Sequence, residues 1–170
     1  MKNVLDCLEE RGFVDQITSP ELRTHLEKPR KIYVGFDPTA DSLHLGNLIP
    51  VMALAWFRKF GHTPVIILGG ATGRIGDPSG KSTERPLLPD SVLDENIRAL
   101  KRSFEKLFSG SGPEPLLLNN DDWLRKFSLV DFLRDVGKLF RVGTMLAKES
   151  VRLRLQSEEG LSFTEFSYQV

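Results

Sequence analysis

The sequence predicts an α/β protein built on a Rossmann-like parallel sheet with flanking helices and preceded by an N-terminal helical arm. Three observations support this fold class. Apolar segments with strand character recur at residues 31–36, 63–68 and 115–118. Helical connections of about 10 to 15 residues separate them, which favours right-handed βαβ units. Loops rich in Gly, Asn and Asp follow the strands, at the edge where parallel sheets bind ligands.

Residues 1–30 form the predicted arm. An amphipathic helix begins at about Val4, and Gly12 is placed to end it. A second short helix follows Ser19-Pro20 and runs to Pro29.

Residues 31–170 are predicted to form one incomplete catalytic domain. Its first strand, 31–36, is expected to be buried. Apolar periodicity and start signals predict helices over residues 48–60, 90–108 and 145–156, and a further helix that begins at Ser128. A capping box at Ser162–Glu165 predicts the start of a last helix. The last helix lacks a Gly, Asn or Pro stop, so we expect it to continue past Val170. The chain is therefore expected to be a fragment.

Charge and cysteine content argue against several classes of protein. Lys+Arg and Asp+Glu number 23 each, so the overall charge gives no reason to expect a nucleic acid or membrane partner. The single cysteine, Cys7, excludes an intrachain disulfide and leaves too few thiols for a zinc site. The N-terminus resembles neither a signal peptide nor a transit peptide, and no apolar run reaches about 18 residues. A soluble cytoplasmic protein is expected.

The loop after the first strand, residues 37–47, runs into a predicted helix start. Free N–H groups and a partial positive charge at a helix N-terminus suit a polyphosphate. Gly46 permits close approach to the backbone, while His44 and Thr39 can donate hydrogen bonds to phosphate oxygens. Taken alone, a single His near a helix start is more often a capping or surface residue.

The glycine-rich loop at residues 69–82 fits neither common phosphate-binding motif. A P-loop ending at Gly80-Lys81-Ser82 requires glycine where this chain has Ile75. A dinucleotide fingerprint requires glycine at Ala71, and Pro78 would disrupt its helix. The loop instead presents the Asp77 carboxylate.

Charged residues around this loop have two competing interpretations. Asp77 can serve a ligand, or can bond its own backbone in an Asp-Pro turn. Lys81 and Arg85 follow as candidate contacts for tRNA or an incoming loop, or as solvated charges. Local sequence leaves both pairs of alternatives open.

Three segments together resemble tyrosyl-tRNA synthetases. Residues 33–47, including Phe-Asp-Pro-Thr-Ala, resemble the first signature of that family, and His44-Leu45-Gly46-Asn47 is similar to the His-x-Gly-His/Asn element of class I synthetases. Residues 76–81 resemble a loop typical of the tyrosine enzyme, and residues 162–169 resemble its amino-acid-pocket helix. The three segments occur in the family's order.

The resemblance implies a reaction and a set of roles. The tyrosine carboxylate would attack the α-phosphorus of ATP, pyrophosphate would leave, and the tyrosyl group would pass to tRNA(Tyr). The implied tyrosine-binding residues are Tyr33 at the phenol, Asp77 and Tyr168 at the ammonium, and Asn120 nearby. The implied ATP-binding residues are Gly35, Asp37, Thr39, His44, Gly46 and Asn47, of which Thr39, His44 and Asn47 form the catalytic set. Mg²⁺ would accompany ATP, with no tightly bound cofactor and no metal site in the protein.

The resemblance also implies a homodimer, with residues 125–166 as the interface region. Val34 and Gly143-Thr144 depart from the family's usual residues. A Lys-Met-Ser-Lys-Ser-type loop and the anticodon-binding domains would follow Val170, so the chain alone is expected to have little adenylation activity. The alternatives are a tryptophanyl-type or other Rossmann nucleotidyltransferase, and a non-catalytic RNA-binding fragment.

Overall fold

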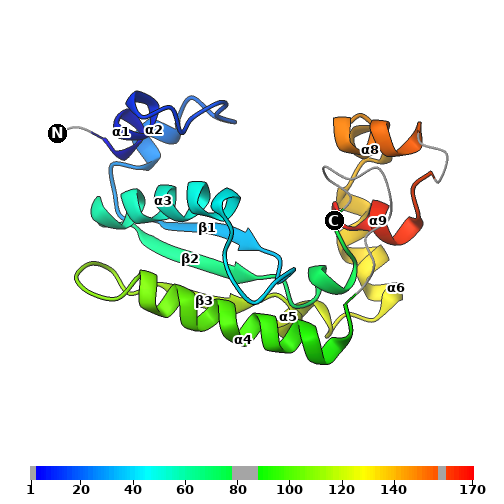
Figure 1. Ribbon diagram of the computed structural model, residues 1–170. Helices are drawn as coiled ribbons and strands as arrows, with labels where there is room; N and C mark the ends of the chain where they lie inside the picture. Colours follow the sequence, from blue (N-terminus) through cyan, green and yellow to red (C-terminus); the bar gives the residue numbers. More distant parts are fainter. Residues whose placement is uncertain (1–2, 78–87, 157–159) are drawn as a thin grey trace. The chain divides into compact units, whose positions relative to one another are not determined.

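The structure is a computed structural model that describes residues 3–77, 88–156 and 160–170. Its residues divide between two compact units, and Figure 1 labels their helices and strands. The first unit comprises Met1–Phe36, Ala40–Leu68 and Asn96–Leu118. The second unit comprises Asp37–Thr39, Gly69–Glu95 and Asn119–Val170.

The first unit contains the arm, the sheet and the helices that cover it. Its elements are α1 (Val4–Glu10), α2 (Leu22–His25), β1 (Lys31–Phe36), α3 (Leu45–Lys59), β2 (Thr63–Leu68), most of α4 (Asp90–Leu107) and β3 (Leu116–Asn119). Within the described ranges, no helix is both long and apolar enough to cross a bilayer.

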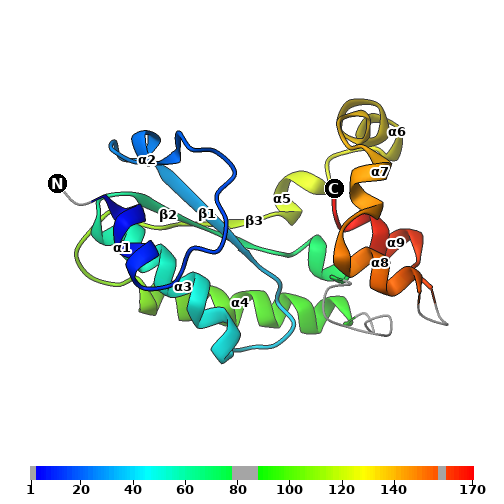
Figure 2. The same cartoon turned by 90° about the horizontal axis from the view of Figure 1, so that it is seen from above.

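The sheet has the order β1-β2-β3, so each strand lies beside the next one in the chain. β1 and β2 are parallel, with a register that runs from Lys31 opposite Thr63 to Phe36 opposite Leu68. Right-handed crossovers between consecutive neighbours place successive helices on one face of a sheet. Figure 2 accordingly shows α3 and α4 on the same side of the strands. The predicted Rossmann-like class is confirmed.

The main core lies between this face of the sheet and the two helices. Its buried residues are Phe36, Val51, Leu54, Ile66, Leu68, Leu100, Phe104 and Phe108. The rings of Phe36 and Phe104 lie 4.7 Å apart between centroids. The strands consist largely of branched apolar residues because such side chains pack well on a pleated, half-covered surface.

The opposite face of β1 is exposed, which corrects the expectation of a fully buried strand. Ile32, Val34 and Phe36 point toward the core, whereas Lys31 and Tyr33 are exposed, and Tyr33 is 72% exposed. Because side chains alternate along a strand, a single layer of helices can cover only one of the two sets.

The arm packs on α3 through a second apolar cluster. Val4, Leu5 and Leu8 of α1, together with Leu26, contact residues of α3. Gly12 has a φ of 73°, the left-handed conformation that ends helices, as predicted. The arm is thus attached to the sheet domain by hydrophobic burial.

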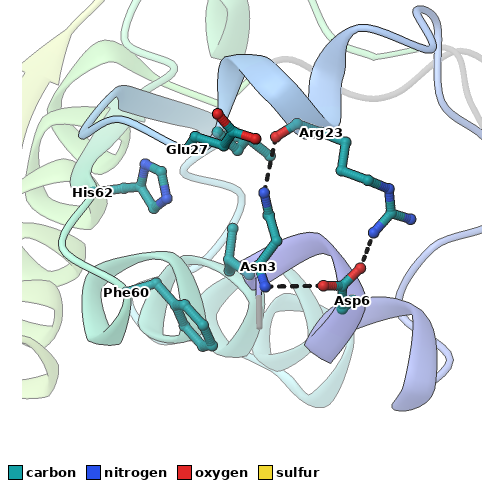
Figure 3. A pocket seen from close by; sticks show the side chains of 8 residues that line it. Asn3, Asp6, Arg23, Glu27, Phe60 and His62 are labelled. Carbon is teal, nitrogen blue, oxygen red and sulfur yellow. Dashed lines mark hydrogen bonds and ion pairs between the residues drawn. The ribbon is translucent and has the colours of Figure 1, made fainter. Parts of the chain in front are cut away.

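A cavity of about 540 Å³ lies between the arm and the end of α3 (Figure 3). The Asn3 side-chain amide donates to the carbonyl oxygen of Arg23 at 2.8 Å, and Arg23 pairs with Asp6. At the same cavity His62 is buried, and its Nδ1 accepts from the N–H of Arg30 at 3.2 Å. Burial lowers the pKa of His62, and the charge of Arg30 lowers this pKa further.

The second unit is mainly helical. Its elements are η1 (Thr72–Arg74), the first turn of α4, α5 (Asp121–Leu124), α6 (Leu129–Asp131), the π-helical η2 (Phe132–Val136), η3 (Gly137–Leu139), α7 (Val142–Leu146), α8 (Glu149–Leu155) and α9 (Phe163–Ser167). Ser128 caps α6, and Ser162 and Glu165 form the predicted capping box of α9. Both helix starts are confirmed.

Two predictions about the later helices are wrong. The single helix expected over 145–156 is divided between α7 and α8, because Lys148 has an extended backbone with ψ at 135°. The last helix was expected to continue beyond Val170, but α9 ends at Ser167. Three-residue turns follow, in which Tyr168 N–H donates to Glu165 and Val170 N–H to Ser167.

Candidate functional site

The predicted phosphate-binding helix start is formed in the first unit. α3 begins at Leu45, three residues earlier than the predicted Leu48. The N–H of His44 donates to Oδ1 of Asn47 at 3.0 Å, and the His44 backbone is extended. This bond fixes the helix entry and brings the predicted residues His44, Gly46 and Asn47 together at an exposed N-terminus.

The His44 ring lies close over Gly46. A Cβ at residue 46 would lie 3.0 Å from Cε1 and 3.1 Å from Nδ1 of His44. Contacts this short are tighter than nine in ten real Cβ contacts, so a larger residue would make the imidazole shift by a few tenths of an ångström. At Gly35, by contrast, a Cβ would meet nothing within 4 Å. Gly35 and Tyr33 both lie on the exposed face of β1.

A hydrogen-bonded network in the second unit surrounds the Asp37 carboxylate, which directly follows β1 in the chain. The Thr72 hydroxyl donates to Oδ1 of Asp37 at 2.7 Å. The Tyr168 hydroxyl donates to Oδ2 at 2.6 Å. Each carboxylate oxygen therefore has one hydroxyl donor and retains a further lone pair for a ligand.

Asn120 completes this network and is 7% exposed. Its Oδ1 accepts from Ala71 N–H at 2.7 Å, and its Nδ2 donates to the Thr72 hydroxyl oxygen at 3.0 Å. Thr72 thus accepts from Asn120 while it donates to Asp37. Thr72, a residue that we did not single out, joins the predicted residues Asp37 and Asn120, and Tyr168 joins Asp37 directly.

The two glycines that follow β2 allow this network to form. A Cβ at Gly69 would collide with the Asp37 carboxylate and the Thr72 hydroxyl, and a Cβ at Gly70 with the Asn119 side chain. Asn119 Oδ1 accepts from Gly70 N–H at 3.1 Å. The paired glycines are the signal in the sequence that could have identified these close approaches.

Arg74 anchors the loop that carries Thr72. Its guanidinium bonds to the carbonyl oxygen of Gly70, contacts Asp90 at 2.9 Å and contacts Asp94 at 3.2 Å. It also lies 3.7 Å from Asp121. The loop after β2 is therefore connected to the starts of α4 and α5 by charged side chains.

The remaining predicted residues occupy separate positions. Asp77 is half-buried in the irregular chain after η1. Thr39 is exposed, and its N–H donates to the carbonyl oxygen of Asp37 at 2.9 Å. Lys81 and Arg85 lie outside the described residues. In the described ranges no three His, Cys, Asp or Glu side chains are grouped so that they could hold a metal ion.

The network provides an oriented negative charge. A carboxylate that accepts two hydroxyl hydrogen bonds remains able to accept further bonds from an ammonium group. Because the groups around it are already aligned, a cationic ligand need not reorganise them on binding. The arrangement is suited to holding a small amine-bearing ligand.

Comparisons of the sequence with known proteins agree on one family. The family model described as tRNA synthetases class I (W and Y) matches residues 25–170. The tyrosine–tRNA ligase of Protochlamydia amoebophila is 56% identical over all of this chain and 40% of its own length. The chloroplastic/mitochondrial tyrosine–tRNA ligase of Arabidopsis thaliana is 51% identical, over 99% of this chain and 34% of its own length.

A solved structure gives the same result. The C-terminally truncated mitochondrial tyrosyl-tRNA synthetase of Aspergillus nidulans superposes with a TM-score of 0.85 at 36% identity, covering 99% of this chain and 51% of that one. The chain therefore spans less than half the length of the curated relatives described above.

Proposed function

Because this chain belongs to the class I tRNA synthetases (W and Y), we propose that it is the N-terminal part of an enzyme that activates tyrosine with ATP and transfers it to tRNA(Tyr). The observation that carries the proposal is the network of Asp37, Thr72, Asn120 and Tyr168. It offers hydrogen-bonding groups for an amino acid in a chain whose curated relatives are tyrosine–tRNA ligases.

In the proposed first step, a tyrosine carboxylate oxygen attacks the α-phosphorus of ATP and pyrophosphate leaves, which gives tyrosyl-adenylate. Thr39, His44 and Asn47 would contact phosphate and ribose, supported by the N–H groups at the start of α3. Donors held in place stabilise the charge that grows on the phosphate oxygens. Mg²⁺ would enter with the ATP substrate.

In the proposed amino-acid site, Tyr33 would bond the substrate phenol, and Asp77 and Tyr168 would hold the ammonium group. Since the Tyr168 hydroxyl donates to Asp37, its oxygen would accept from the ammonium. Asp37 would add a second carboxylate near the cation, and Asn120 would hold the network in place through Thr72.

We further propose that the enzyme is a homodimer with its interface within residues 125–166. Support comes from apolar side chains exposed in this region: Leu129, Val130, Leu133, Leu139, Val142 and Phe163. Water contact with so much apolar surface is unfavourable, and a partner subunit would remove it.

In the proposed domain organisation, residues 1–30 are an arm and residues 31–170 are part of the catalytic domain. Lys81 and Arg85 would contact the incoming tRNA or a later loop of the protein.

Calorimetric titration of the full-length protein with tyrosine, tryptophan and tyrosinol tests the proposal. We expect saturable binding of tyrosine and tyrosinol and no comparable binding of tryptophan, because a polar phenol pocket leaves its own groups unpaired with an indole. The family model covers both amino acids, so preference for tryptophan is the outcome that would replace this proposal. The proposed compartment is the cytoplasm, which fits the single free thiol of Cys7.

A further inference from the structure

The second unit contains a buried ion pair that the proposed chemistry does not use. Nη2 of Arg154, in α8, donates to the Glu165 carboxylate, in α9, at 2.9 Å to Oε2 and 3.3 Å to Oε1. Each side chain is only 3% exposed. Because burial of two charges is costly, such pairs are often poor sources of stability and can instead specify one arrangement.

Glu165 is also the residue that organises the start of α9. Its N–H donates to Oγ of Ser162 at 3.2 Å, and its Oε2 accepts from Ser162 N–H at 3.4 Å. Among the five residues of α9, Glu165 is the one whose side chain is buried, while Phe163 is 75% exposed. The one fully buried side chain of α9 is therefore a polar anchor.

Tyr168 follows Glu165 by three residues, a spacing that places both on neighbouring positions of a helical turn. The Tyr168 hydroxyl reaches Oδ2 of Asp37 at 2.6 Å. Hydrogen bonds between hydroxyl and carboxylate oxygens need heavy-atom separations of about 2.5–3.0 Å. A small rotation of α9 would therefore break this contact.

We propose that Arg154 and Glu165 are positioning residues for Tyr168. Their ion pair fixes α9 in the orientation in which the Tyr168 hydroxyl meets Asp37. The inference deepens the proposed function, and its consequence for tyrosine binding rests on that function. Neither charged side chain touches substrate in this scheme, because the pair acts through Tyr168.

The chain is convenient for a direct test because it contains only two tyrosines, Tyr33 and Tyr168. Tyrosine labelled with ¹³C at Cζ gives one NMR signal for each phenol, and Tyr33→Phe assigns them. We expect Arg154→Met and Glu165→Gln each to move the Tyr168 signal toward that of the exposed Tyr33. Arg152→Met, at an exposed position of α8, is the matched control and should leave the signal in place.

A double variant separates positioning from simple stabilisation. Arg154→Met with Glu165→Gln leaves no uncompensated buried charge, and Gln still supports a capping box. If the pair positions α9, the unfolding midpoint recovers relative to the single variants while the Tyr168 signal stays displaced. If the signal returns with the midpoint, or never moves in folded single variants, the inference is wrong.

Tyrosine titration of the full-length protein distinguishes this inference from the function on which it rests. The double variant should bind tyrosine about tenfold more weakly, as expected for loss of one charge-assisted hydrogen bond, with ATP affinity unchanged. If wild type fails to bind tyrosine while the NMR result holds, the proposed function fails and the positioning pair stands. If both proteins bind tyrosine equally and the Tyr168 signal is unmoved, only the positioning pair fails.

Discussion

The hydroxyl of Thr72 lies 2.7 Å from Oδ1 of Asp37 and accepts a hydrogen bond from Nδ2 of Asn120 at 3.0 Å. One small side chain therefore connects a carboxylate that follows β1 to an amide that follows β3. Neither neighbour can keep its bond if this hydroxyl is lost.

Replacement of Thr72 by Val should destabilise the protein by about 1–3 kcal/mol, because the nearly isosteric change removes the hydroxyl that pairs with Oδ1 of Asp37 and with Nδ2 of Asn120. Urea unfolding monitored by circular dichroism measures the loss. Thr72→Ser retains the hydroxyl and should cost much less. A loss in Thr72→Val no greater than the loss in Thr72→Ser would contradict the role given to the hydroxyl.

Replacement of Gly46 by Ala should weaken ATP binding by about tenfold in the full-length protein, since the new Cβ displaces the His44 ring from its position over residue 46. Folding stability should not fall greatly, because Ala favours a helix over Gly by roughly 0.5–1 kcal/mol. Equilibrium titration with ATP and thermal unfolding provide the two measurements.

Gly35→Ala is the matched comparison for Gly46. Its Cβ meets nothing within 4 Å, so its stability should be unchanged. A loss of ATP affinity in this variant would then reflect contact with the nucleotide itself. Unaltered ATP affinity in Gly46→Ala would contradict the role given to His44.

Stability should fall as the solution is acidified through the range below pH 6.5, in part because of His62. Burial and Arg30 lower the pKa of His62 in the folded protein relative to the ordinary value of 6.5. The unfolded chain therefore takes up a proton at a higher pH, so stability falls from about pH 6.5 toward the lower folded pKa.

His62→Gln should reduce this pH dependence, because Gln does not titrate and can still accept from Arg30 N–H. Chemical denaturation at several pH values gives the slope. His25→Gln, at an exposed position of α2, is the control and should preserve the wild-type slope. Identical slopes for His62→Gln and wild type would exclude His62 as the titrating group.

Leu139→Asp should shift the protein toward monomer if residues 125–166 form the subunit interface. Leu139 is 72% exposed, so the charge should cost the isolated subunit little, whereas it would be buried in a dimer. Sedimentation velocity at micromolar concentration reports the change. Leu107→Asp, in α4, provides an exposed apolar control outside the region, and a monomeric wild type would contradict the interface.

This chain alone should show little or no tyrosine-dependent ATP–pyrophosphate exchange, because it spans 40% of the tyrosine–tRNA ligase that it matches at 56% identity. Radiolabelled pyrophosphate incorporation measures the exchange, with the full-length protein as the positive control. Exchange near the full-length rate would mean that this chain contains a complete active site.

Features set by local sequence were predicted well. The strands at 31–36 and 63–68 are confirmed residue for residue, because each is a run of apolar and branched side chains bounded by turn-forming residues. The start of α3 was placed at Leu48 instead of Leu45, since Asn47 reaches back to cap His44 rather than belonging to a preceding turn. Reciprocal caps that use a His are not a common start signal.

The polar network could be predicted only in part. Asp37, Asn120 and Tyr168 were assigned through resemblance, but Thr72 joins Asp37 across 35 residues and Asn120 across 48. Periodicity and turn chemistry describe neighbours in sequence, so they contain no information about which distant hydroxyl will meet which carboxylate. The Gly69-Gly70 pair was the only local sign of that crowding.

The sequential order of the three strands has a consequence for how the chain acquires its structure. Each strand pairs with the next to be synthesised, so no pairing has to wait for a strand beyond its immediate successor. The pairing of β1 with β2 needs only residues up to Leu68 and can begin before the rest has emerged from the ribosome. Sheet formation can thus follow the direction of translation.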